Sequence, residues 1–295
     1  MKYHSPRLVG ISTALAAVTI WAVFLLGTRW GVRGIFTVEE ILFLRLLSGA
    51  LITIPFMIKL GVFVRNQGLI GTLMLTIGSS AVFPYFVSLG LFYAPASDAG
   101  AIAPGMLPFW TVLFSWILLG EVVSNRRIMG LGFILFGALV VGLWQIVSGP
   151  ESGVWKGHLL FLLGAGLFSV YTIHFRRSGL SPTHGLVISL FWGTITFLPI
   201  LTLSGNIDFQ EVNWYDILNM SILQGLLNAV LALLFYSIAV QQIGTAQAGA
   251  FGALTPILAL IGGVLFLEEA ITLTKTVGVC LVAFGVLLAS GVFEK

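Results

Sequence analysis

Two pairs of polar side chains interrupt long apolar stretches of this chain, each pair spaced by one helical turn. Thr76 and Ser80 form the first pair, and Gln224 and Asn228 form the second at an offset of 148 residues. Residues four apart lie on one face of a helix. Hydroxyl and amide groups placed in this way would hydrogen-bond the amino or carboxyl group of a small molecule, or would bond neighbouring helices to one another.

Aromatic, sulfur-containing and further polar residues near the middle of apolar stretches extend this set of substrate-binding candidates. They are Trp21, Ser88, Met106, Trp110, Tyr171 and Tyr236. Ser88 and Tyr236 are also separated by 148 residues, so they are equivalent to each other, and they continue the polar face. A pocket lined by Met, Trp and Tyr suits an amphipathic or aromatic metabolite. The alternative for each single residue is core packing.

Four prolines fall inside apolar stretches that are long enough to be single helices: Pro84, Pro104, Pro108 and Pro256. An interior proline removes a backbone hydrogen bond, frees a carbonyl and bends the helix. Such bends are either hinges of a gate or fixed kinks. Pro108 and Pro256 are equivalent by the same offset, and this match favours a gating role.

Few charged residues fall inside or at the ends of the apolar stretches. Arg45 and Asp98 are placed so that an ion pair between them is plausible, and Glu121 and Glu269 end equivalent helices, where we expect helix-end hydrogen bonds. A single cysteine, Cys280, excludes an intramolecular disulfide. We expect no metal and no cofactor. The chain has no phosphate-binding GxxxxGK[ST] motif and no nucleic-acid-binding motif.

The elements that position these residues follow from the composition of the chain. The 295 residues are 58% hydrophobic and 8% charged, whereas soluble domains carry about 25% charged residues. The lipid bilayer is therefore the solvent, and a spanning helix needs about 20 apolar residues. We predict an all-α membrane protein with ten transmembrane helices, at residues 8–28, 38–58, 68–91, 97–120, 127–147, 157–175, 184–204, 217–240, 247–267 and 275–292.

The chain contains two copies of one pattern. Seven residues of the first half recur in the second at a constant offset of 148: Pro108, Leu119, Glu121, Gly130, Phe136, Gly137 and Leu139. We therefore predict two repeats, residues 1–148 and 149–295, with five helices each. An odd number of helices inverts the second repeat relative to the first, which is typical of transporters built around a central site.

The distribution of positive charges orients the helices. With both termini in the cytoplasm, nine of the fourteen lysine and arginine residues fall on the inside and four on the outside, and Arg45 lies within a span. The inside residues include Arg126, Arg127, Arg176 and Arg177. The positive-inside rule favours this orientation, so we predict a multi-pass inner-membrane protein with both termini in the cytoplasm.

Residues 89–121 with 129–142, and again residues 246–288, carry a recognisable motif: a proline within a helix, a glutamate at its end, and a glycine-containing helix next. These positions are Pro108, Glu121 and Gly137, and then Pro256, Glu269 and Gly285. With Trp21 in the first helix and Arg45 in the second, the chain resembles the EamA-type, ten-helix branch of the drug/metabolite transporter superfamily. The resemblance implies export or exchange of small metabolites, often amino acids. It also implies, with the polar residues above, a cavity between helices 1, 3, 4, 6, 8 and 9.

The predicted function is therefore export or exchange of a small metabolite, most often an amino acid in this family, by alternating access. Amphipathic drugs or nucleotide-related metabolites are the alternative substrates. An intramembrane enzyme, a channel and a membrane scaffold are the competing classes. The absence of GxSxG, HExxH and paired midplane aspartates from the sequence argues against an enzyme. The expected partners are the substrate and the bilayer, with monomer and homodimer equally open.

Overall fold

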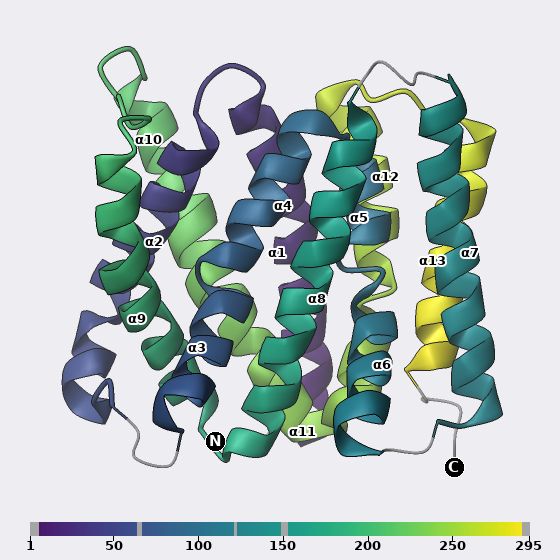
Figure 1. Ribbon diagram of the computed structural model, residues 1–295, viewed down its shortest axis with the longest axis horizontal. Coiled ribbons are helices and arrows are strands. Elements are labelled where there is room, and N and C mark those ends of the chain that lie inside the picture. Colours follow the sequence, from purple (N-terminus) through teal and green to yellow (C-terminus); the bar gives the residue numbers. More distant parts are fainter. Residues whose placement is uncertain (1–5, 64–66, 121–122, 149–152, 291–295) are drawn as a thin grey trace.

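The structure is a computed structural model that describes residues 6–63, 67–120, 123–148 and 153–290. Every regular element in these ranges is a helix (Figure 1). Nine helical segments within them are long and apolar enough to cross a membrane, and a tenth, Leu273–Ala289, is a shorter apolar helix. The prediction of an all-α, multi-pass membrane protein is confirmed.

Seven helices make up the first half of the chain. They are α1 (Pro6–Val32), α2 (Val38–Leu60), α3 (Gly68–Ser79), α4 (Val82–Tyr93), α5 (Ala96–Ile102), α6 (Leu107–Leu119) and α7 (Asn125–Ser148). The first turn of α2 is fixed by a capping box, because the Thr37 hydroxyl accepts from the Glu40 N–H and the Glu40 carboxylate accepts from the Thr37 N–H. Such a box satisfies two otherwise unpaired donors of a helix start.

The second half repeats this order. Its helices are α8 (Val154–Ser178), α9 (Pro182–Leu203), α10 (Trp214–Ser221), the π-helix η2 (Ile222–Ala232), α11 (Leu233–Phe251), α12 (Leu254–Leu267) and α13 (Leu273–Ala289). The segment α10–η2–α11 is continuous up to Gly244, whose φ of 81° breaks the helix. The following residues lead into α12.

The prolines mark where predicted single spans are interrupted. The third span divides into α3 and α4, and Pro84 is the third residue of α4. The fourth divides into α5 and α6, where Pro108 lies in the first turn of α6 and Pro104 lies in the turn between them. Pro256 is the third residue of α12. A proline is tolerated in the first turn because the missing N–H has no intrahelical acceptor there.

The two halves run through the molecule in opposite directions. In Figure 1, α1 rises and α7 rises, whereas α8 and α13 descend, so that α1 begins and α13 ends at the same end of the molecule. The halves therefore form the two inverted five-helix repeats that the sequence predicts. The predicted boundary between residues 148 and 149 falls where residues 149–152 lie outside the described ranges, and it stays a prediction.

Helices of one repeat pack mainly on helices of the other. α1 lies against α11 and α12, and in the inverted arrangement α8 lies against α3, α4 and α6, while α2 packs on α9. α7 and α13 form a pair at one side (Figure 1). Glycines allow their close approach: a Cβ on Gly130 would lie 2.5 Å from the Ala289 nitrogen, and one on Gly137 would lie 2.7 Å from the Gly278 oxygen.

The equivalence of the repeats extends to helix caps. α6 ends at Gly120 with φ 65° and ψ 20°, and α12 ends 148 residues later at Glu268 with φ 55° and ψ 31°. Both residues have the left-handed conformation that ends many helices and favours glycine. Glu268 is the one non-glycine residue with positive φ among the described residues.

Candidate functional site

A cavity of about 600 Å³ lies between the repeats. It is lined by Trp21 of α1, by α6, by the last turns of α8, by α11 around Tyr236 and Gly249, and by the end of α13. Val123, Arg127 and Ser290 also line it, so the cavity reaches the end of the molecule where α6 ends and α7 begins. We call this end the cavity end, and the opposite one, where α5 begins and α12 ends, the closed end.

One wall of the cavity is aromatic. The Trp21 ring lies 5.1 Å from the Tyr236 ring and 6.0 Å from the Phe168 ring, measured between centroids. Phe168 and Tyr171 are buried behind this wall and do not line the cavity; their rings lie 5.4 Å apart, and Tyr171 is stacked on Phe175. Large aromatic surfaces bind the apolar body of a ligand at low entropic cost. The structure thus joins Trp21, Tyr171 and Tyr236, three of the predicted aromatic residues, through Phe168.

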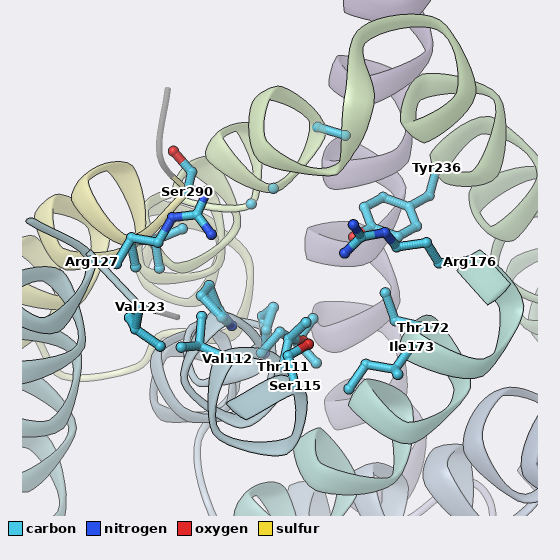
Figure 2. A pocket seen from close by; sticks show the side chains of 18 of the residues that line it. Thr111, Val112, Ser115, Val123, Arg127, Thr172, Ile173, Arg176, Tyr236 and Ser290 are labelled. Carbon is cyan, nitrogen blue, oxygen red and sulfur yellow. The ribbon is translucent and has the colours of Figure 1, made fainter. Parts of the chain in front are cut away.

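The opposite wall and the mouth of the cavity are more polar. Thr111 and Ser115 of α6 face Thr172 of α8 across the space in Figure 2. Arg127 and Arg176 lie on opposite sides of the mouth in this view, and Arg177 also lines it. Guanidinium groups bind carboxylates through paired hydrogen bonds. The arrangement offers an apolar interior with hydroxyl groups and a cationic entrance.

The predicted polar face does not line this cavity. Thr76, Ser80, Gln224 and Asn228 are each at most 5% exposed. The Ser80 hydroxyl donates to the backbone oxygens of Thr76 and Ser189, and the Gln224 amide donates to the Thr28 hydroxyl at 2.8 Å. These bonds hold helices together, which is the alternative that the sequence left open. A role of these side chains in substrate binding stays a prediction.

Three further predicted residues also lie outside the cavity lining, and of these Ser88 and Met106 are buried. Ser88 lies in α4, Met106 precedes α6, and the Trp110 ring packs against Phe109 and Phe114. Pro84 and Pro256 also lie outside the lining, whereas Pro104 and Pro108 are part of it. Of the four prolines, the two in the interrupted α5–α6 segment are therefore the ones placed to move with a bound ligand.

The expected ion pair between Arg45 and Asp98 is wrong. The Arg45 guanidinium is buried and donates to the backbone oxygens of Ser79 at 3.3 Å and Gln224 at 3.4 Å. Those carbonyls belong to the end of α3 and to the π-helix, where helix irregularity leaves backbone oxygens available. Arg45 therefore joins two irregular helices, one from each repeat.

Asp98 has other partners. Its carboxylate lies 3.0 Å from the Nζ atom of Lys275 and 3.0 Å from the Nε2 atom of His158, and all three side chains are buried. Asp98 is in the first turn of α5, where its side chain faces α8 and α13 rather than α2. Lys275 belongs to the first turn of α13.

The structure describes one of the two glutamates that are predicted to end helices. Glu269 accepts hydrogen bonds from the backbone N–H groups of Ala96 at 2.6 Å and Ser97 at 3.0 Å, so its predicted helix-end role is confirmed. Glu121 lies outside the described residues.

Sequence reasoning missed several residues of the cavity and of the closed end. Thr111 and Ser115, which line the cavity, were missed, and so was Phe168, which is buried behind Trp21 and Tyr236, although Phe168 is three residues before Tyr171 and Thr111 directly follows Trp110. The predicted set of lining helices also needs correction. The third span contributes no described lining residue, whereas α7 and α13, in the fifth and tenth spans, do. His158 and Lys275 gave no signal because their partner lies far away in the chain.

Comparison with known proteins gives a family for this architecture. A family model described as the EamA-like transporter family matches residues 8–143 and again residues 155–291. Among individual proteins, the chain is 24% identical over 203 residues to an "Uncharacterized transporter YyaM" of Bacillus subtilis (strain 168). That match covers 66% of this chain and spans 65% of the length of that transporter.

A solved crystal structure has the same fold. It superposes with a TM-score of 0.66 and 20% sequence identity, and the match covers 96% of this chain and 97% of that one. At this identity the likeness establishes the fold alone.

Proposed function

The chain belongs to the EamA-like transporter family, and from this premise we propose that it exports or exchanges amino acids or similar small metabolites by alternating access. The observation that carries the proposal is the cavity of about 600 Å³ between the inverted repeats, whose described lining residues reach the cavity end and include none from the closed end. A site between inverted repeats that is exposed to one side at a time is the structural basis of alternating access.

The lining favours a substrate with an apolar body and a carboxylate. Trp21 and Tyr236 would contact the apolar part, and the hydroxyls of Thr111, Ser115 and Thr172 would bond polar groups. The described lining residues include three arginines, and guanidinium groups bind carboxylates. An amino acid fits this description better than a cationic amphipathic drug does.

The orientation of the protein decides the direction of loading. We propose that the cavity end faces the cytoplasm of an inner-membrane protein, because Arg127, Arg176 and Arg177 cluster there and cytoplasmic segments carry an excess of positive charge. Substrate would then enter the cavity from the cytoplasm and leave through the closed end after that end opens.

Counterflow in liposomes tests the function and the substrate class together. Liposomes containing the purified protein are loaded in turn with single amino acids, and exchange of labelled substrate is followed. We expect saturable exchange for one group of amino acids with apolar side chains. If monodisperse protein exchanges none of them, the substrate class is wrong, and a channel would give flux that does not saturate.

A matched pair of tryptophan variants tests the site. Trp21→Ala removes the aromatic wall, and we expect exchange to fall by about tenfold, which corresponds to roughly 1.4 kcal/mol of lost contact. Trp214→Ala is the control, since Trp214 is 60% exposed at the start of α10 and away from the cavity. Equal exchange by both variants would mean that the cavity is not the transport site.

A further inference from the structure

A chain of polar side chains, buried except for the half-buried Glu269, connects three helices and the segment after α12 at the closed end. Asp98 binds both Lys275 and His158 at 3.0 Å, and Lys275 also donates to the Ser97 hydroxyl at 2.9 Å. The Ser97 hydroxyl then donates to the Glu269 carboxylate at 2.6 Å. We call Ser97, Asp98, His158, Glu269 and Lys275 the closed-end network. It joins α5, α8 and α13 to Glu269, which lies between α12 and α13.

Backbone contacts surround this network. The Glu269 carboxylate receives the first two N–H groups of α5, and the Arg29 guanidinium donates to the backbone oxygens of Leu91 and Phe92 at the end of α4. α5 and α12 also touch directly, because a Cβ on Gly100 would lie 2.6 Å from the Cβ of Ala259. Substrate could pass through this end only after these contacts separate.

The energetics favour two discrete arrangements of the network. Asp98 is 0% exposed and Lys275 is 5% exposed, and charged groups within a membrane protein are stable when they are paired or reached by water. Separating the pair without letting water in would leave two uncompensated charges, which is strongly unfavourable. The closed end is therefore either dry with the network intact or open to water with the network broken.

The repeat gives the cavity end no equivalent of this pair. At the offset of 148 residues, Lys275 corresponds to Arg127, which keeps the positive charge. Asp98, however, corresponds to Ala246, and His158 corresponds to Gly10. Gly10 is packed closely on α11, since a Cβ there would lie 2.5 Å from Ile243. At this offset the sequence therefore preserves neither the central carboxylate nor its imidazole partner.

Resting on the transport function proposed above, we propose that the closed-end network is a one-sided lock. It holds the carrier closed at this end in the absence of substrate, and its rupture is the step that each turnover must drive. Because the cavity end lacks Asp98 and His158, the substrate-free carrier rests with its cavity open at the arginine-lined end. Exposure of the site at the closed end is the minor state.

Hydrogen–deuterium exchange of the purified protein tests the lock without any substrate. In Asp98→Asn and in Lys275→Met, we expect the backbone amides of α5 to exchange at least about tenfold faster than in the parent protein, because local opening exposes them. Amides of α9, which has no part in the network, serve as the internal reference and stay unchanged. The double variant should also exchange faster than the parent protein but no faster than the single variants, since it breaks the pair without leaving an uncompensated buried charge.

Two exposed residues provide matched controls. Glu211→Gln removes one acidic group and Lys156→Met removes one basic group, and both side chains are exposed. We expect neither to change exchange in α5. If Asp98→Asn does not fold, Ser97→Ala is used in its place, because it removes only the hydroxyl between Lys275 and Glu269. Faster exchange of the α5 amides is again the expected result.

Two results would overturn the lock. One is unchanged exchange of α5 in folded Asp98→Asn and Lys275→Met. The other is an equal acceleration in α5 and α9, which would make the network a general contribution to stability. If the α5 amides exchange faster in the variants as expected but the parent protein shows no counterflow, the transport proposal is overturned instead. The two proposals therefore fail separately.

Discussion

The two ends of the molecule are made from the same repeated elements, yet the pairing of Asp98 with His158 and Lys275 joins helices at one end, and the cavity of about 600 Å³ opens at the other. Both have a helix that ends in a left-handed residue, Gly120 at the cavity end and Glu268 at the closed end. Both then start a helix with a hydroxyl cap, Ser124 accepting from the Arg127 N–H and Thr272 accepting from the Lys275 N–H. The backbone design is therefore shared between the ends.

The difference lies in a few residues that the repeat does not preserve. Asp98 and His158 complete a buried network at the closed end, whereas Ala246 and Gly10 occupy the equivalent positions in the sequence. Duplication thus supplies a symmetric frame, and a small number of unmatched polar residues makes the two ends unequal. Pairs of variants, one at each end, test this interpretation; the pairs Lys275 with Arg127 and Glu268 with Gly120 are at equivalent positions.

The largest difference is expected between Lys275→Met and Arg127→Met. Lys275→Met leaves the Asp98 carboxylate buried without its cation, and we expect the free energy of unfolding to fall by about 3–5 kcal/mol. Arg127 is partly exposed at the cavity mouth, so its loss should cost at most about 1 kcal/mol. Reversible unfolding in mixed micelles measures the free energy of unfolding of both variants. Equal losses would contradict the interpretation that the two ends differ.

Glycine substitutions test the packing difference. A Cβ at Gly100 would meet Ala259 at 2.6 Å, whereas nothing lies within 4 Å of a Cβ at Gly249, on the cavity wall. We expect Gly100→Ala to cost about 1–3 kcal/mol through overpacking. Gly249→Ala should be neutral or stabilising by up to about 1 kcal/mol through helix propensity. The same unfolding measurement applies, and a stable Gly100→Ala would show that the closed end is looser than described.

Serine hydroxyls at the two ends give a smaller contrast. Ser97→Ala leaves Lys275 and Glu269 without their shared partner, and we expect a loss of about 1–2 kcal/mol. Ser115→Ala changes a cavity-lining hydroxyl that water can replace, and we expect a loss below about 0.5 kcal/mol. If the two losses are the same, the Ser97 hydroxyl does not bridge the network in the folded protein.

The smallest expected difference in stability is at the helix C-caps, where one substitution should stabilise the protein and the other should destabilise it. Glu268→Gly places glycine in a left-handed position, and we expect stabilisation by up to about 1 kcal/mol. Gly120→Ala forces a side chain into the same conformation at the cavity end and should cost about 1 kcal/mol. Thermal unfolding of the two variants in one detergent checks the signs. A destabilised Glu268→Gly would reveal a contact of the Glu268 side chain that outweighs backbone strain.

Much of the fold followed from the sequence because bilayer solvation and duplication leave strong patterns. The spans, the inversion and the interruption near Pro84, Pro108 and Pro256 all depend on local composition or on the repeat. Glu269 was also placed correctly at a helix end, because its position in the repeat puts it directly after an apolar helix.

The site was harder to predict because burial and partners depend on packing between distant helices. The polar face at Thr76 and Gln224 has the spacing of a cavity wall, but the helices rotate it into their contacts, where Thr28 and Ser189 receive its bonds. Asp98 was assigned to Arg45, on the same side of the predicted membrane, although His158 and Lys275 approach it more closely in the fold. No local pattern marks which helix a side chain will face.

The glycine contacts between α7 and α13 have a consequence for the origin of the chain. Gly130 lies against Gly285, and Gly137 lies against Gly278, so each glycine meets the repeat equivalent of the other. A half-length ancestor inserted into the membrane in both orientations would make this same contact between two copies, through one pair of positions related by a two-fold axis. Gene fusion would then have fixed the orientation of each copy and freed the two ends to diverge.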